Sequence, residues 1–224
     1  MHSEICEVVI SSNPNAKALT KAKERKIDVI SFNETTNKNP EVLDTSICEV
    51  LYEHKVDLVL LAGFIKKIGP KVLSVYEGSI LNIHPSLLPK YGGQGLYGIN
   101  VHRAVIGAGE KKSGATIHLV NSDYDKGTIL AQKSVIVDAD DTPESLAAKV
   151  LEVEHVLYVE TVKKIIEGNI DSEEIFLEDK EVGKLLIKNK NPFALIKIQN
   201  DLLNFEKIYQ CGKAKVKILK PAWI

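Results

Sequence analysis

The sequence has few cysteines and no long apolar run, and each shortage excludes a class of protein. Its three cysteines, Cys6, Cys48 and Cys211, are an odd number at wide spacings without a CxxC pair, which argues against a disulfide framework or a cysteine-rich zinc site. No apolar run reaches the roughly 18 residues that a membrane-spanning helix needs. Residues 1–4 lack the basic and apolar regions of a signal peptide. We therefore expect a cytoplasmic protein that is not associated with a membrane.

Net charge is almost absent as well. The 224 residues include 29 basic and 30 acidic side chains, a formal net charge of −1, with 44% hydrophobic residues. This composition is typical of a globular protein with a substantial core. It does not require a polyanion-binding surface, so nucleic acid is not expected as a partner. The oligomeric state stays open, with a homodimer as one candidate.

Short apolar segments alternate with segments of helical periodicity in the first part of the chain. We expect strands at residues 6–10, 27–32, 56–61 and 79–83, and helices at 15–25, 40–54 and 68–76. This order predicts an α/β fold with an open, doubly wound, mostly parallel sheet. Residues 113–121 and 127–137 predict two strands without an intervening helix, hence an antiparallel pair at one side. A long helix is predicted at 142–167.

The end of the chain differs in composition. We predict a domain at residues 1–170 and a C-terminal extension of unknown role at 171–224. Residues 184–220 contain nine lysines and two acidic residues, for which a solvated basic face is the simplest explanation. The extension keeps apolar segments, so its composition does not indicate disorder.

The clearest chemical signal is the segment Asn82-Ile83-His84-Pro85. Side chains alternate along a strand, so Asn82 and His84 point to the same side. Ligands of open α/β sheets bind at the C-terminal ends of the strands, where this pair stands. An amide and an imidazole together can stabilise the negative charge that forms when a carbonyl is attacked. A carboxylate from the loop 123–127 would orient His84 or shuttle protons.

Two other features have simpler explanations. Gly93-x-Gly95-x-x-Gly98 has the spacing of a dinucleotide-binding loop, but it does not follow a strand and no acidic residue stands about 20 positions further on. A flexible glycine loop is therefore favoured. His118 lies among apolar residues of a predicted strand, so we interpret it as a buried supporting group.

The segment Asn82–Tyr91 (NIHPSLLPKY), preceded by LLAGF at 60–64 and followed by Asp125-x-Gly127, resembles the phosphoribosylglycinamide formyltransferase family. The resemblance covers roughly residues 5–168. It implies the formyltransferase fold and a folate-dependent step of purine synthesis. In that step the amine of glycinamide ribonucleotide attacks the formyl carbon of 10-formyltetrahydrofolate. No metal is expected, because the electrophile is already activated.

The resemblance also implies roles for single residues. Asn82 and His84 would polarise the formyl oxygen, and Asp125 would hold His84 and relay a proton from the amine to the folate nitrogen. The residues expected to bind the pterin ring are Phe64, Ile65, Lys66, Lys67 and Ile68. Those expected on the substrate side are Glu154, Pro85 and His102.

Related activities stay open. The same Asn/His/Asp set occurs in 10-formyltetrahydrofolate hydrolase and in sugar and methionyl-tRNA formyltransferases. A non-catalytic folate-binding protein is an alternative from another class.

The family's first strand and its Gly-Ser-rich phosphate loop have no counterpart here, because the strand from Cys6 matches the family's second strand. We expect weaker ribonucleotide binding as a result. A shortened chain or misassigned start is the favoured explanation. Replacement by a strand from residues 215–219 and a degenerate paralogue are the alternatives.

Overall fold

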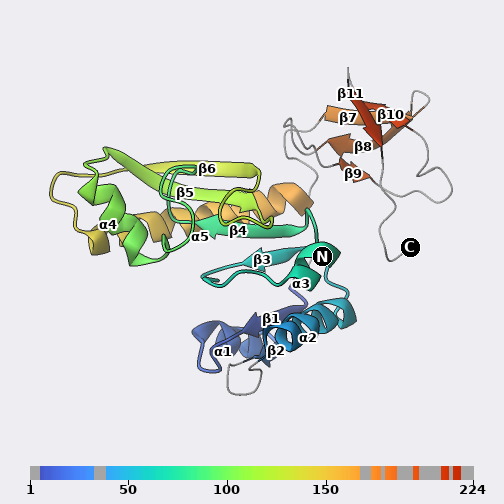
Figure 1. The fold of residues 1–224 in the computed structure, drawn as a ribbon, viewed down its shortest axis with the longest axis horizontal. Helices are drawn as coiled ribbons and strands as arrows, with labels where there is room; N and C mark the ends of the chain where they lie inside the picture. The colour runs from blue at the N-terminus through green and yellow to red at the C-terminus, as the bar shows by residue number, and fades with distance from the viewer. Residues whose placement is uncertain are drawn as a thin grey trace. The chain divides into compact units, whose positions relative to one another are not determined.

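The computed structural model describes residues 6–32 and 39–166, and the backbone of five short strands after residue 172. The chain has two compact units, whose elements are labelled in Figure 1. Unit 1 is Met1–Leu81 with Val120–Ser122, and unit 2 is Asn82–Leu119 with Asp123–Ile224. The boundary falls within strand β4, directly before Asn82.

Unit 1 alternates strands and helices, as its sequence predicts. Its elements are β1 (Val8–Ser11), α1 (Lys17–Glu24), β2 (Asp28–Ser31), α2 (Pro40–Glu53), β3 (Val59–Leu61), α3 (Pro70–Val75) and the start of β4 (Ile80–His84). β1 and β2 pair in parallel. Apolar side chains of α2, α3 and β4 form the core, and they are Cys48, Leu51, Val72, Tyr76 and Ile80.

A buried carboxylate organises the start of α3. Asp44 of α2 accepts hydrogen bonds from the backbone N–H groups of Lys71 (2.7 Å) and Val72 (3.2 Å). These N–H groups have no partner within their own helix, so an acceptor from elsewhere is needed. Gly69 makes this possible, because a Cβ there would overlap the Asp44 carboxylate.

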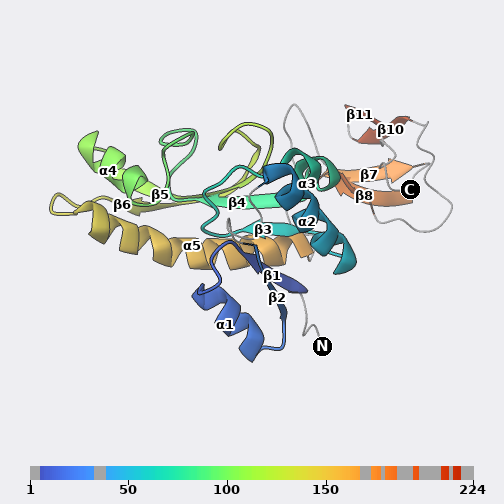
Figure 2. The same cartoon turned by 60° about the horizontal axis from the view of Figure 1, so that its bottom comes forward.

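Unit 2 holds the rest of the α/β structure. After the end of β4 come α4 (Ile99–Gly107), β5 (Lys112–Leu119), β6 (Ile129–Ile136) and α5 (Pro143–Ile166). Helix α5 packs against β5, β6 and α4, and Figure 2 shows it running along one face of the two strands. The largest fully buried apolar side chains of this unit, each at most 1% exposed, are Val101, Val105, Ile117, Leu146 and Val150.

The predicted α/β fold is confirmed, including the antiparallel pair, which is β5 with β6. The strand order is β3-β4-β5-β6 in a four-stranded sheet, and β1-β2 form a separate sheet. Among the described strands none pairs with both β1 and β3.

One alternative from the sequence is wrong. The strand character of residues 215–219 is found in part, as β11 (Ala214–Lys217), but β11 does not join the sheets of the α/β fold. It pairs antiparallel with β10 (Ile208–Cys211). The reason is local: β10 and β11 are close in sequence and form a hairpin, which has a low entropic cost of closure. The described part of the extension is a sheet in the order β11-β10-β7-β8-β9, with β7 Glu173–Leu177, β8 Lys180–Leu185 and β9 Ala194–Ile196.

Asp44→Ala is expected to lower the free energy of unfolding by about 1–3 kcal/mol, because two helix N–H groups lose a buried acceptor. Urea unfolding followed by circular dichroism measures the change. Glu49→Ala on the same helix is the control, since Glu49 is exposed and its loss removes the same charge. Equal stability of the two variants would contradict the capping role.

Candidate active site

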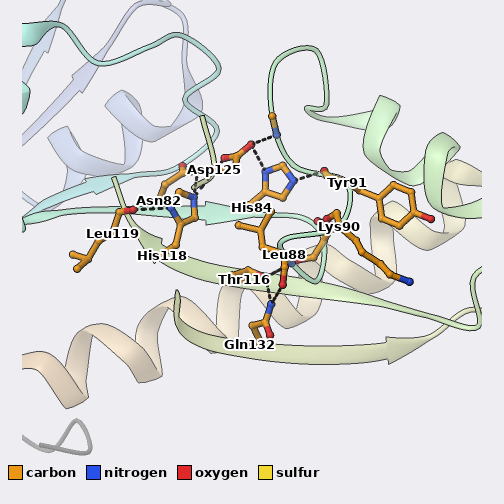
Figure 3. Close-up of polar contacts among 12 residues, drawn as sticks. Asn82, His84, Leu88, Lys90, Tyr91, Thr116, His118, Leu119, Asp125 and Gln132 are labelled. Atoms are coloured by element: carbon orange, nitrogen blue, oxygen red, sulfur yellow. Dashed lines mark hydrogen bonds and ion pairs between the residues drawn. The ribbon is translucent and has the colours of Figure 1, made fainter. Parts of the chain in front are cut away.

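Polar side chains gather where β4 ends, in unit 2. Asn82 and His84 alternate with Ile83 along the strand, so they lie on one side of it (Figure 3). His84 is buried, and Asn82 is half-buried. Their strand-end position is the one that the sequence predicts.

Asp125 stands between two histidines. Its Oδ2 lies 3.5 Å from Nδ1 of His84, and its Oδ1 lies 3.5 Å from Nε2 of His118. All three side chains are at most 12% exposed. Asn82 Nδ2 lies 3.1 Å from the same His118 nitrogen. The structure therefore brings together Asn82, His84 and Asp125, and adds His118 to the cluster.

The backbone of the segment after Pro89 contacts both His84 and Asp125. Nε2 of His84 donates to the carbonyl oxygen of Tyr91 at 2.8 Å, and the backbone N–H of Gly93 donates to Asp125 Oδ2 at 2.8 Å. Tyr91 and Asp125 have φ of 57° and 54°, a backbone region that side chains with a Cβ rarely adopt. Both contacts to His84 thus come from strained residues, a pattern common at functional sites.

Strands β5 and β6 hold the turn that follows His84. The hydroxyl of Thr116 donates to the carbonyl of Ser86 (2.6 Å) and accepts from the N–H of Leu88 (3.1 Å). Gln132 Nε2 contacts both Thr116 Oγ1 (2.8 Å) and the Leu88 carbonyl (2.9 Å). The exit segment of β4 is therefore fixed by side chains and does not depend on its prolines alone.

Burial and the neighbouring groups act in opposite directions on the pKa values of His84 and Asp125. Burial lowers the pKa of His84 below its usual value, although the charge of Asp125 and the Tyr91 carbonyl oppose this effect. Burial acts to raise the pKa of Asp125, but the contacts from His118, Gly93 and His84 outweigh it, so this pKa lies below the usual value. The arrangement favours a neutral imidazole beside a charged carboxylate.

Two of the residues predicted on the substrate side are titratable and partly or fully buried. His102 on α4 is 4% exposed, and its Nδ1 has no hydrogen-bond partner among the described residues. The pKa of His102 is lowered mainly by burial and to a smaller extent by electrostatic interaction with His84. Burial raises the pKa of Glu154 on α5 to about 7. Pro85, directly after His84, is half-buried.

The predicted pterin-binding loop belongs to unit 1 and follows β3. Phe64 is 38% exposed and Ile65 61% exposed. Lys66 and Lys67 are exposed as well, whereas Ile68 is half-buried. Two exposed apolar side chains in a loop are compatible with a flat apolar ligand, and the role stays a prediction.

Four contacts of the site are not predicted from the sequence. Two are the contacts of His118 with Asn82 and Asp125, since the sequence indicates only a supporting role for this histidine. The other two are those of the Tyr91 carbonyl with His84 and of the Gly93 N–H with Asp125, because backbone groups carry no residue signature. The only signal was position, since both lie just after the NIHPSLLPK segment.

Among residues 6–32 and 39–166, no group of three His, Cys, Asp or Glu side chains is placed to hold a metal ion. Within the described part of the chain, no helix has both the length and the apolar character that crossing a bilayer requires.

Comparison with known proteins agrees with this fold. The protein family described as formyl transferase matches residues 2–162, so the chain belongs to the formyl transferase family. Several relatives are named phosphoribosylglycinamide formyltransferase, and the resemblance inferred from residues 82–91 is thereby confirmed. The Haemophilus influenzae enzyme is 36% identical over 162 residues, which cover 72% of this chain and 74% of that protein.

Two further relatives extend the comparison. The chloroplastic enzyme of Arabidopsis thaliana is 47% identical over 173 residues, 76% of this chain and 57% of that protein. The crystal structure of the Streptococcus pneumoniae enzyme has 36% identity and a TM-score of 0.67, covering 73% of this chain and 88% of that one. The chain spans a little more than half the length of the plant relatives, 57% and 54%.

Asp125→Asn is expected to lower the pKa of His84 further, because the carboxylate charge that favours the imidazolium is removed. A pH titration of the His84 ring signals by NMR measures the shift. Asp123→Asn, an exposed charge in the same loop, is the control and should leave the His84 pKa nearly unchanged. An unchanged or higher pKa in Asp125→Asn would contradict the contact.

Glu154→Gln is expected to stabilise the protein more at pH 8 than at pH 5. The folded-state pKa of about 7 lies above the ordinary 4.5, so the folded state binds the proton more tightly and loses stability as pH rises between these values. Urea unfolding of both proteins at the two pH values gives the difference. Glu152→Gln, exposed on the same helix, should show no such dependence.

Proposed function

We propose that this chain transfers the formyl group of 10-formyltetrahydrofolate to the amine of glycinamide ribonucleotide. The observation that carries the proposal is the cluster of Asn82, His84 and Asp125 at the end of β4. The Asp125 carboxylate lies 3.5 Å from Nδ1 of His84, and the Asn82 amide joins them through His118, whose Nε2 lies 3.1 Å from Asn82 Nδ2 and 3.5 Å from Asp125 Oδ1. The names of the relatives, phosphoribosylglycinamide formyltransferase, support the same acceptor and the same group.

The reaction needs charge stabilisation and one proton transfer. The amine nitrogen forms a bond to the formyl carbon, and the carbonyl oxygen takes up negative charge. The bond from carbon to the folate nitrogen then breaks, and the proton lost by the amine ends on that nitrogen. An N–H of Asn82 stabilises the oxyanion, as an oxyanion-hole donor does.

His84 and Asp125 handle the proton. Nε2–H of His84 is already engaged with the Tyr91 carbonyl, so Nδ1 is the nitrogen that exchanges a proton. Once protonated, Nδ1–H faces the Asp125 carboxylate and adds positive charge beside the oxyanion. Asp125 keeps this cation in place and relays the proton to the leaving nitrogen, directly or through water.

The substrates are assigned to residues as the resemblance implies. The segment Phe64–Ile68 binds the pterin ring of the folate, and Glu154, Pro85 and His102 serve the ribonucleotide. The unpartnered Nδ1 of His102 supports a polar contact there. The reaction uses formyl folate as co-substrate and has no step that needs a metal.

The cellular setting is part of the proposal. We propose action in the cytoplasm on small molecules, with neither nucleic acid nor membrane as a partner and with a homodimer as a candidate assembly. The printed names of two plant relatives place those proteins in the chloroplast, so localisation of a tagged chain checks this point separately.

The test is turnover of 10-formyltetrahydrofolate with and without glycinamide ribonucleotide, which is titrated to high concentration. The wild-type chain should turn over only with the ribonucleotide. His84→Ala, Asn82→Ala and Asp125→Asn should each lower kcat by about 10²–10³-fold, the typical loss for such a group.

Matched controls are His155→Gln and Asp123→Asn, both at exposed positions, which should keep wild-type turnover. Turnover without the ribonucleotide would indicate a hydrolase instead. Folate binding without turnover would indicate a non-catalytic folate-binding protein. Near wild-type kcat in Asp125→Asn or His84→Ala would reject the assigned roles.

A further inference from the structure

We infer that His118 is a positioning residue that, as the neutral tautomer protonated on Nδ1, fixes the orientation of the Asn82 amide. His118 is 2% exposed and need not touch a substrate to act in this way. Its role follows from which of its two ring nitrogens carries the hydrogen, and its neighbours decide that.

The first neighbour is a backbone carbonyl. Nδ1 of His118 lies 2.8 Å from the carbonyl oxygen of Leu119. A carbonyl oxygen only accepts, so Nδ1 must carry the hydrogen. The N–H of Leu119 donates to the carbonyl of Thr128 (2.8 Å), and a Cβ at Gly127 would overlap the Leu119 carbonyl. The oxygen is therefore held tightly against the ring.

The sheet is irregular beside this histidine. The register of β5 and β6 shifts between Ile117 and His118, where Ile117 pairs with Ala131 but His118 pairs with Ile129. The extra residue on β6 is Leu130. Bulges of this kind are frequent next to functional sites, and this one lies at the histidine that contacts both Asn82 and Asp125.

The second neighbour is the Asn82 amide. With hydrogen on Nδ1, Nε2 of the neutral ring is an acceptor, and Asn82 Nδ2 at 3.1 Å donates to it. If the amide were turned around, its acceptor oxygen Oδ1 would face Nε2 of His118, which is also an acceptor. One amide hydrogen is thus committed to His118, and the orientation of the second, which we assign to the formyl oxygen, is fixed with it.

A competing arrangement exists and makes the inference falsifiable. If Nε2 were also protonated, it would pair with Asp125 Oδ1, which lies 3.5 Å away. Asn82 would then turn its carbonyl oxygen toward the ring, and its N–H groups would point elsewhere. The two arrangements differ by a proton on Nε2 of His118, which is directly observable.

The first experiment is ¹⁵N NMR of the histidine rings in the wild-type chain at pH 7. We expect His118 to show a protonated Nδ1 and an unprotonated Nε2, with Nε2 coupled to the Asn82 amide. Assignment uses His118→Gln, which removes the signals. An imidazolium, or a ring protonated only on Nε2, overturns the inference, and this result does not depend on any activity.

The second experiment uses two matched variants and rests on the proposed function. The amide of Gln reaches the position of Nε2 and restores an acceptor for Asn82, whereas that of Asn reaches Nδ1 and restores only the donor to Leu119. His118→Gln should keep kcat within roughly tenfold, and His118→Asn should lose about 10²–10³-fold, as Asn82→Ala does. His155→Asn is the control for an exposed histidine.

A double mutant separates positioning from general damage. In the Asn82→Ala background, His118→Asn should lower kcat no further, because the group it positions is gone. A further loss of the same size, or equal losses in His118→Gln and His118→Asn, overturns the inference. If the wild-type chain has no formyl transfer activity, the proposed function fails and the NMR result alone decides the role of His118.

Discussion

A single carboxylate between two buried imidazoles is the interaction on which the site depends. Asp125 contacts His84 with one oxygen and His118 with the other, and each histidine is tied in turn to a backbone carbonyl. A buried carboxylate is costly unless its lone pairs are satisfied. The Gly93 N–H donates to Oδ2 of this carboxylate, and protonation of His84 Nδ1 adds a second donor, so the charge lies where segments from four parts of unit 2 meet.

The backbone is arranged to bring this charge into place. Asp125 lies in a left-handed conformation, and Gly127 allows the Leu119 carbonyl to approach closely. Gly92 has a similar role, because a Cβ there would meet the side chains of Leu88 and Asp125. The start of the glycine loop is thus needed for close packing over the site as well as for the flexibility that the sequence indicates.

The sequence predicts side-chain positions in the site where these positions follow from the periodicity of one strand. The alternation along β4 predicts that Asn82 and His84 share a side, and the structure has them there. The position of Asp125 could only be taken from the resemblance, since a loop of five residues has no periodicity. The contacts of His118 depend on a register shift in β6, and the pairing of β11 with β10 depends on competition between strands. Neither leaves a local pattern in the sequence.

The electrostatics of the pair define how many protons the site holds. Burial lowers the pKa of His84, and the contacts of Asp125 lower the pKa of its carboxyl, which leaves Nδ1 of His84 as the place for one proton in the proposed reaction. Taking up that proton creates an ion pair in a site of low dielectric, where opposite charges attract strongly. Because the Tyr91 carbonyl holds the other nitrogen, the ring does not need to turn between accepting a proton and passing it on. The proposed formyl transfer takes one proton from one nitrogen and gives it to another, and one proton is what this pair has room to hold.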